Sequence, residues 1–256
     1  MVRVGVVGAR GRMGTAVCEL VEAASDLELC CGIERQGHPD IGKPIGTGKV
    51  QAGLQDVLSG LDVLVDFSLP AGLRERAAAA AESQKAYVCG VTGLAEQDMQ
   101  AMRDAAKRIP VVYASNFSVG VNVLYKLARE TAEMLGPGYD IEIVETHHRH
   151  KRDAPSGTAR TLAELLKQAT GATAVVHGRS GETGPRPAKE IAVHSIRAGD
   201  VVGEHTVIFG AQGERLELTH RASSREAFAS GVLPAIRFAA ASRPGFYSMS
   251  DVLSAR

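Results

Sequence analysis

The residues best suited to chemistry lie together in one polar segment, 145–159, which reads Glu-Thr-His-His-Arg-His-Lys-Arg-Asp-Ala-Pro-Ser-Gly-Thr-Ala. It runs into an amphipathic pattern that predicts a helix over 158–169. Unpaired N–H groups and the helix dipole favour anions at a helix N-terminus, so a cationic cluster there predicts an anion site. We expect this site to bind a small dianion. One carboxylate would bind at Ser156, Gly157 and Thr158, and the other would bind at His148 and Lys151.

His147, in the same segment, is suited to proton transfer. An imidazole titrates near neutrality, and a positioned acid or base typically contributes about 10²- to 10⁴-fold in rate. A metal site would use the three histidines, but Arg149, Lys151 and Arg152 interleave with them and repel a cation. We therefore predict no metal. A local nucleic-acid patch and a solvated charged turn remain the alternative interpretations.

A second candidate site is the glycine-rich turn over 8–14, which reads Gly-Ala-Arg-Gly-Arg-Met-Gly between a strand pattern, 3–7, and a helical pattern, 13–24. Glycines let backbone N–H groups at a helix N-terminus approach a pyrophosphate. The next strand, 27–33, is followed by Glu34, where an acid can hold the adenine ribose hydroxyls. Together these features predict a dinucleotide site. The G-x-x-G-x-x-G spacing is less specific than the commoner motif, so a plain tight turn stays the alternative.

The rest of the first half positions this turn. Apolar strand patterns alternate with helical patterns, which predicts a parallel sheet covered on both faces. The expected strands are 63–67, 86–91 and 111–114, and the expected helices are 72–83 and 96–108. Ligands of such sheets bind at the carboxyl ends of the strands, so the loops at 66–68, 90–93 and 114–117 should line the same crevice. Residues 37–48, rich in glycine and proline, are predicted to be an exposed loop.

The regular alternation of strand and helix patterns ends after Phe117, which indicates a second domain. Helical patterns at 121–135 and 158–169 flank a strand pattern at 140–146, and the strand patterns 190–197, 204–209 and 215–220 predict an antiparallel meander. A last helix over 225–241 is apolar enough to pack on the first sheet. The expected domains are 1–118, completed by 225–256, and 119–224.

Composition excludes several classes of protein. Lys+Arg and Asp+Glu both number 29, so no overall field attracts nucleic acid or an anionic membrane. The four cysteines lack C-x-x-C spacing and are expected to be reduced core thiols. Met1 leads directly into a strand pattern, without a basic leader, and no apolar run approaches the ~20 residues of a membrane span. We expect a cytoplasmic protein.

The segment 145–159 closely resembles the signature of the 4-hydroxy-tetrahydrodipicolinate reductases, or dihydrodipicolinate reductases, of lysine and diaminopimelate biosynthesis. The resemblance extends to the G-R-M-G turn and to residues 90–93, 114–122, 197–200 and 220–225. It implies an α/β fold with a Rossmann-like parallel-sheet nucleotide domain, a central α+β substrate domain with a mixed sheet, and a homotetramer. It also implies that NADH or NADPH reduces 4-hydroxy-tetrahydrodipicolinate to tetrahydrodipicolinate with loss of water.

The resemblance assigns roles to individual residues. His147 would donate and accept protons, Lys151 would donate a proton and contact substrate, and His148, Gly157 and Thr158 would bind carboxylate. Cofactor contacts would come from Gly8, Ala9, Arg10, Gly11, Arg12, Met13, Glu34, Arg35, Gly90, Val91, Thr92, Ala114, Ser115, Asn116 and Phe117. Arg10 and Val91 depart from the expected family residues, but those positions chiefly offer backbone groups.

Two other function classes stay open at this point. Another nicotinamide-dependent oxidoreductase, such as an amino-acid dehydrogenase, would explain the glycine turn but not the histidine-rich segment. A non-enzymatic dinucleotide sensor would need the fold and no acid–base residue. Within the favoured class, Glu34 favours NADH and Arg35 favours the 2′-phosphate of NADPH. The two effects should nearly cancel, which predicts use of both cofactors.

Overall fold

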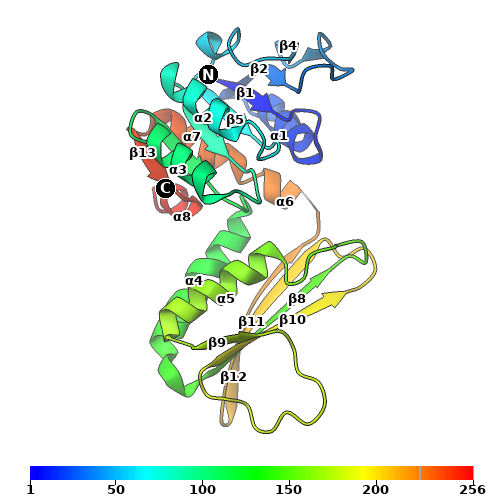
Figure 1. The fold of residues 1–256 in the computed structure, drawn as a ribbon, viewed down its shortest axis with the longest axis vertical. Helices are drawn as coiled ribbons and strands as arrows, with labels where there is room; N and C mark the ends of the chain where they lie inside the picture. The colour runs from blue at the N-terminus through cyan, green and yellow to red at the C-terminus, as the bar shows by residue number, and fades with distance from the viewer. Residues whose placement is uncertain (225, 256) are drawn as a thin grey trace. The chain divides into compact units, whose positions relative to one another are not determined.

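The computed structural model describes residues 1–224 and 226–255, and the chain divides into two compact units. The first unit combines Met1–Val119 with Phe228–Arg256, so the chain leaves it and returns. The second unit is Gly120–Ala227. Figure 1 shows a sheet with helices in each unit.

The first unit is built on a mostly parallel sheet. Its strand order in the described chain is β13-β7-β6-β5-β1-β2-β4-β3. The order reverses at β1, which pairs in parallel with both β2 and β5; such a reversal opens a crevice at the strands' carboxyl ends. The strands are β1 (Val2–Val7), β2 (Leu27–Ile33), β3 (Pro44–Ile45), β4 (Gly48–Gln51), β5 (Val63–Asp66), β6 (Ala86–Cys89), β7 (Pro110–Tyr113) and β13 (Gly245–Tyr247).

Helices cover both faces of this sheet, as the near-continuous apolar strands require. One face packs against α1 (Arg12–Ala23), α7 (Val232–Ala241) and α8 (Met249–Ser254). The other packs against α2 (Leu73–Glu82) and α3 (Glu96–Ala105), while the 3₁₀ turn η1 (Leu58–Gly60) adds Leu58 to the same core. The Rossmann-like nucleotide fold predicted for this half is confirmed.

The cysteines of the first unit are free thiols, as expected. Cys18, Cys31 and Cys89 are buried, and burial raises the pKa of each to about 12. Thiols held protonated in an apolar core are poor nucleophiles and poor metal ligands.

The prediction of a loop over 37–48 is wrong at its C-terminal end. β3 pairs antiparallel with β4, and β4 pairs in parallel with β2, so this segment extends the sheet. The chain turns at Gly46, whose φ of +54° suits glycine and whose Cβ would lie 2.0 Å from the Leu29 carbonyl oxygen. Glycine is therefore needed here for close packing as well as for the turn.

The prediction of one helix over 225–241 is also wrong. Arg225 lies outside the described residues, and the segment forms α6 (Glu226–Ala229) and then α7. The two helices are separated at Gly231, where a Cβ would lie 1.7 Å from the Phe117 carbonyl oxygen. The crossing chain, which the local pattern cannot show, breaks the helix. As expected, α7 packs on the first sheet.

The second unit has a mixed sheet with the strand order β12-β11-β8-β10-β9. Apolar residues of α4 and α5 form one core with one face of this sheet. The mixed sheet implied by the family resemblance is confirmed. The elements are α4 (Val119–Leu135), the 3₁₀ turn η2 (Gly136–Gly138), β8 (Asp140–His147), α5 (Gly157–Thr170), β9 (Ala174–Val176), β10 (Glu190–Arg197), β11 (Gly203–Ala211) and β12 (Glu214–Ala222).

The predicted antiparallel meander is wrong for its first strand. β10 pairs in parallel with β8, whereas β11 lies on the other side of β8 and pairs antiparallel with β8 and β12. A parallel pair needs a long crossover connection, and α5 provides one between β8 and β10. The parallel register places Arg197 opposite His147 and Ser195 opposite Glu145. The central position of β8 thereby brings residues from distant segments to the histidine-rich segment.

None of the helices in residues 1–224 and 226–255 combines the length and apolar character needed to cross a bilayer.

The close approach at Gly231 generates the first prediction. Gly231→Ala should lower the free energy of unfolding by the upper end of the ~1 to 3 kcal/mol typical of overpacking, because the obstructing atom belongs to the backbone. Gly60→Ala is the matched control, since a Cβ there meets nothing within 4 Å. Thermal unfolding of both full-length variants measures the difference. Equal midpoints for the two would contradict the argument.

Candidate functional site

The glycine turn packs its backbone directly against the start of α1. Gly8 has φ +74°, and a Cβ on Gly14 would lie 1.9 Å from the Gly8 carbonyl oxygen. The Gly11 N–H closes the turn by donating to that same oxygen at 2.9 Å. Gly11 is also the N-cap of α1 and supplies no side-chain cap. The first turn of α1 can therefore accept an external anion at close range.

Glu34 connects the end of β2 to this turn. Its Oε1 accepts a hydrogen bond from the Arg10 backbone N–H at 2.7 Å. The Arg10 guanidinium instead contacts the β2–β4 connection, with Nε 3.2 Å from Asp40 Oδ2 and a hydrogen bond to the Pro44 carbonyl oxygen. Glu34 therefore fixes the backbone of the turn, a role that the sequence pattern did not indicate.

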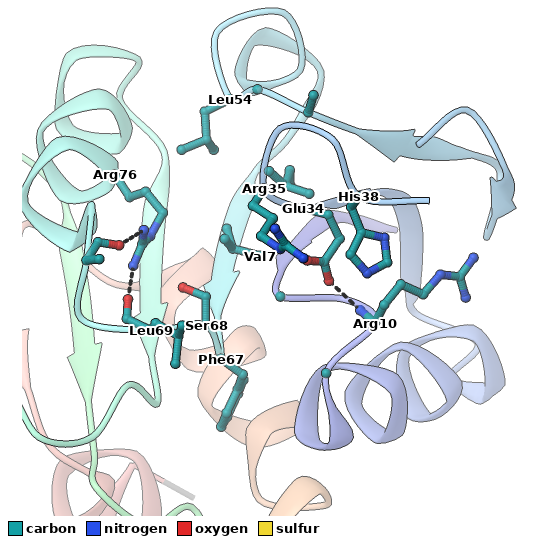
Figure 2. A pocket seen from close by; sticks show the side chains of 16 residues that line it. Val7, Arg10, Glu34, Arg35, His38, Leu54, Phe67, Ser68, Leu69 and Arg76 are labelled. Atoms are coloured by element: carbon teal, nitrogen blue, oxygen red, sulfur yellow. Dashed lines mark hydrogen bonds between the residues drawn. The ribbon is translucent and has the colours of Figure 1, made fainter. Parts of the chain in front are cut away.

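A cavity of about 700 Å³ opens beside Glu34 (Figure 2). Five residues predicted to bind cofactor line it: Gly8, Arg10, Gly11, Glu34 and Arg35. The lining also includes residues that were not predicted, among them His38, Leu54, Leu69 and Arg76. These residues come from loops and from α2, where no motif marks them in the sequence.

Buried Asp66 organises the opposite wall of this cavity. Its carboxylate accepts hydrogen bonds from Arg76 Nε and from the Tyr87 hydroxyl, each at 2.6 Å. The same guanidinium donates to the carbonyl oxygens of Leu69 and Ala71, as Figure 2 shows. Burial and the neighbouring carboxylate raise the pKa of Tyr87 well above its ordinary value. The loop after β5 is therefore held in one conformation.

A second cavity, of about 350 Å³, is lined by other predicted cofactor residues together with Phe67, Ser68 and Phe228. A Cβ at Gly90 would lie 2.2 Å from the Phe67 ring, so glycine is needed there. The predicted residues in this lining are Met13, Gly90, Thr92, Ser115, Asn116 and Phe117. The remaining four line neither cavity: Ala9 and Val91 are buried in the cores, Arg12 is exposed and Ala114 packs against the core.

The second unit contains a tightly paired glutamate and histidine at the end of β8. His147 Nδ1 lies 2.5 Å from Glu145 Oε2, and Glu145 is fully buried. Arg197 donates to both oxygens of this carboxylate, at 2.9 and 2.8 Å, and the Ser156 N–H donates to Oε1 at 3.1 Å. Burial alone would raise the pKa of Glu145, but these hydrogen bonds hold it well below its usual range. The carboxylate is ionised, and both of its oxygens accept hydrogen bonds.

Ser156 and His205 complete this cluster. The Ser156 hydroxyl caps α5 by accepting from the Ala159 N–H, and it lies 3.0 Å from His205 Nε2. His205 is 3% exposed, and its ring lies edge to face with that of His147 at a centroid distance of 5.2 Å. Burial, then the charge of His147, lower the pKa of His205 to about 3. His205 is therefore neutral near pH 7, and neither it nor Glu145 was predicted as a site residue.

The other predicted substrate residues lie in the loop after β8 and in the first turn of α5. Lys151 Nζ pairs with Asp153 Oδ1 at 2.9 Å, and the Lys151 N–H donates to the His148 carbonyl oxygen. Gly157 is exposed and Thr158 half-buried in the first turn of α5. Positively charged and hydrogen-bonding groups thus gather near His147. No group of three potential metal ligands occurs within residues 1–224 and 226–255.

The comparisons with known proteins agree along the whole chain. The family model described as "Dihydrodipicolinate reductase, N-terminus" matches residues 2–117, and the C-terminal model of the same family matches residues 120–253. A 4-hydroxy-tetrahydrodipicolinate reductase of Anaeromyxobacter sp. (strain Fw109-5) is 48% identical over 100% of this chain and 99% of the relative. Another, from Akkermansia muciniphila, is 49% identical over 99% of this chain and 98% of its own.

Solved structures add a likeness in fold. A dipicolinate-bound dihydrodipicolinate reductase from Paenisporosarcina sp. TG-14 aligns with a TM-score of 0.83 and 26% identity over 97% of both chains. A probable dehydrogenase from Thermotoga maritima aligns with a TM-score of 0.63 at 12% identity, which shows the fold alone.

Sequence identity over the full length does not favour either an amino-acid dehydrogenase or a dinucleotide sensor. The family catalyses the reduction step of lysine and diaminopimelate biosynthesis with NAD(P)H. The chain therefore belongs to the dihydrodipicolinate reductase family and is an oxidoreductase of that pathway.

Proposed function

We propose that His147 is the proton-transfer residue of this reductase, with Lys151 as a second donor that also contacts substrate. The observation that carries the proposal is the pairing of His147 Nδ1 with a buried, ionised carboxylate. This pairing leaves Nε2 as the nitrogen that can exchange a proton. An imidazole held in this way is a suitable general acid or base.

We assign cofactor binding to the first unit. NADH or NADPH fits the residues present, because the first turn of α1 has no side-chain cap and Gly8, Gly11, Glu34 and Arg35 line the larger cavity. The pyrophosphate would bind at the N-terminus of α1, the adenine ribose at Glu34, and the nicotinamide beside Gly90, Thr92 and Asn116. When bound, the cofactor supplies the hydride.

The chain's own residues supply position, charge and the proton. Once the hydroxylated substrate has lost water to give a conjugated imine, addition of a hydride increases electron density on the ring, which the cations Lys151 and protonated His147 would stabilise. One proton from these residues then completes the two-electron reduction. Lys151 keeps a fifth of its side chain exposed beside Asp153, so its ammonium group can reach a bound ligand.

The substrate is proposed to be a small dicarboxylate. The Paenisporosarcina relative is described with dipicolinate, which is a ring dicarboxylate. His148, Lys151, Gly157 and Thr158 offer the cations and the helix N-terminus that such a ligand needs. Ser156 is better explained as a structural residue, because its side chain is buried and its hydroxyl caps α5.

We also infer that the chain forms the homotetramer expected for the family and functions in the cytoplasm, where amino-acid biosynthesis takes place. The face of the second sheet opposite its helices supports self-association, because Val144, Ile196 and Ile208 share it and Ile196 is 45% exposed.

The role of His147 is tested by His147→Gln. We expect kcat to fall by about 10²- to 10⁴-fold with little change in NAD(P)H affinity, because only a proton-transfer group is removed. Steady-state kinetics and cofactor titration measure the two effects. His177→Gln, in a loop of the same unit, is the control. Unchanged kcat in His147→Gln would remove this residue from the mechanism.

Lys151→Ala should damage both substrate binding and turnover, because one ammonium group serves both tasks. We expect KM for substrate to rise and kcat to fall, each by about tenfold or more, as for loss of a charge-assisted contact. Lys126→Ala on α4, where the lysine pairs only loosely with Glu130, should leave both constants unchanged. A change confined to nicotinamide affinity would contradict the assignment.

Cofactor preference is tested by Glu34→Gln and Arg35→Ala. The glutamine can still accept the Arg10 N–H but no longer repels a 2′-phosphate, so the NADPH-to-NADH ratio of kcat/KM should rise about tenfold or more. Arg35→Ala should lower that ratio by a similar factor. Both ratios are measured at one ionic strength. Equal effects on the two cofactors would show that the ribose binds elsewhere.

A further inference from the structure

We infer that Glu145 is a positioning residue for the reductase: its buried carboxylate fixes the tautomer and orientation of His147, and Arg197 keeps that carboxylate in place. The inference rests on the proposed role of His147 and deepens it, because it states which ring nitrogen exchanges the proton and what holds it there.

The hydrogen-bond donors around Glu145 determine which atom carries the proton between His147 and Glu145. Two N–H groups of Arg197 and the Ser156 N–H all donate to this carboxylate, so it is ionised and acts only as an acceptor. The hydrogen in the 2.5 Å contact must therefore lie on His147 Nδ1. The neutral ring then carries its lone pair on Nε2, and the charged ring carries its second proton there.

Arg197 keeps the Glu145 carboxylate ionised. A fully buried carboxylate without a cation would tend to take up a proton, and it could then donate to His147 instead of accepting. The Arg197 guanidinium prevents this protonation by donating to both carboxylate oxygens. Its Nη2 also donates to the Asp153 carbonyl oxygen. The parallel register of β8 and β10 places Arg197 opposite His147, so the sheet itself sets this geometry.

A glycine keeps the space around His147 Nε2 open. A Cβ on Gly203 would lie 3.1 Å from His147 Nε2, so glycine at the start of β11 keeps this nitrogen uncrowded. The nearby ring of His205 stays uncharged, because burial lowers its pKa to about 3. It therefore supports the imidazole by contact without competing for Glu145.

Charged and titratable groups face His147 from several elements. Glu145 and Arg197 face it from β8 and β10, His205 from β11 with His220 beside it on β12, and Lys151 follows in the next loop. Among these groups, Glu145 is the one that accepts a hydrogen bond from His147 Nδ1.

The experiment compares Glu145→Gln with Glu142→Gln in the full-length protein. Glu142 is the matched control, since it lies on the same strand, pairs with Arg179, Arg186 and His194, and has a pKa lowered to about 2 by these hydrogen bonds, although burial opposes the shift. It does not contact His147. The ¹⁵N resonances of the imidazoles report the tautomer without any need for turnover, and His147→Gln assigns the signal.

We expect the wild type and Glu142→Gln to show the Nδ1–H tautomer of His147, and Glu145→Gln to show a mixture of tautomers. In Glu145→Gln, kcat should fall at least about 100-fold, within the ~10⁴-fold known for loss of tautomer control. Glu145→Asp, which keeps the charge, should retain the tautomer and recover part of kcat.

The inference is overturned if the tautomer and kcat of Glu145→Gln match those of Glu142→Gln. Should Glu145→Gln fail to fold, Glu145→Asp and Arg197→Gln decide: the tautomer must persist in the former, which keeps the carboxylate, and become mixed in the latter, which removes the cation. Full activity in His147→Gln would instead refute the proposed function, and the resonances would still show whether Glu145 controls the ring.

Discussion

A carboxylate removed from water is tolerated only when donors surround it, and Glu145 imposes this requirement on the whole second unit. Its donors come from three places in the chain: His147 on the same strand, Arg197 on β10 and the Ser156 N–H at the start of α5. Satisfying them requires the crossover through α5 and the parallel pairing of β8 with β10. The mixed sheet is therefore what brings the donors of Glu145 together around His147.

The first unit uses the same device for a different purpose. Asp66, also fully buried, fixes the loop after β5 through Arg76, and Glu34 fixes the glycine turn through the Arg10 N–H. Asp66 holds the Arg76 guanidinium, which donates to a backbone carbonyl oxygen, and Glu34 accepts directly from a backbone N–H. The cavity walls are therefore held in shape before a ligand binds. Preorganised walls lower the ordering cost of binding a long, flexible dinucleotide.

The likeness to the probable dehydrogenase at TM-score 0.63 shows that another protein shares this architecture, and a shared fold does not by itself fix the function. In the present chain, a paired histidine at the end of β8, a lysine and a helix N-terminus lie within about a dozen residues. The substrate residues that we propose all lie in the second unit.

The sequence by itself determined the local features: the strand-turn-helix at Gly8, the histidine-rich segment with Lys151, and the chemical class of both sites, since these depend on residues close in the chain. Only the tertiary structure decided which partners distant segments supply. It identified Glu145, Arg197 and His205 as the surroundings of His147, made Ser156 a helix cap, and broke the last helix where Phe117 crosses it. Strand order and close backbone contacts leave no periodic signal in sequence, so pattern could not predict them.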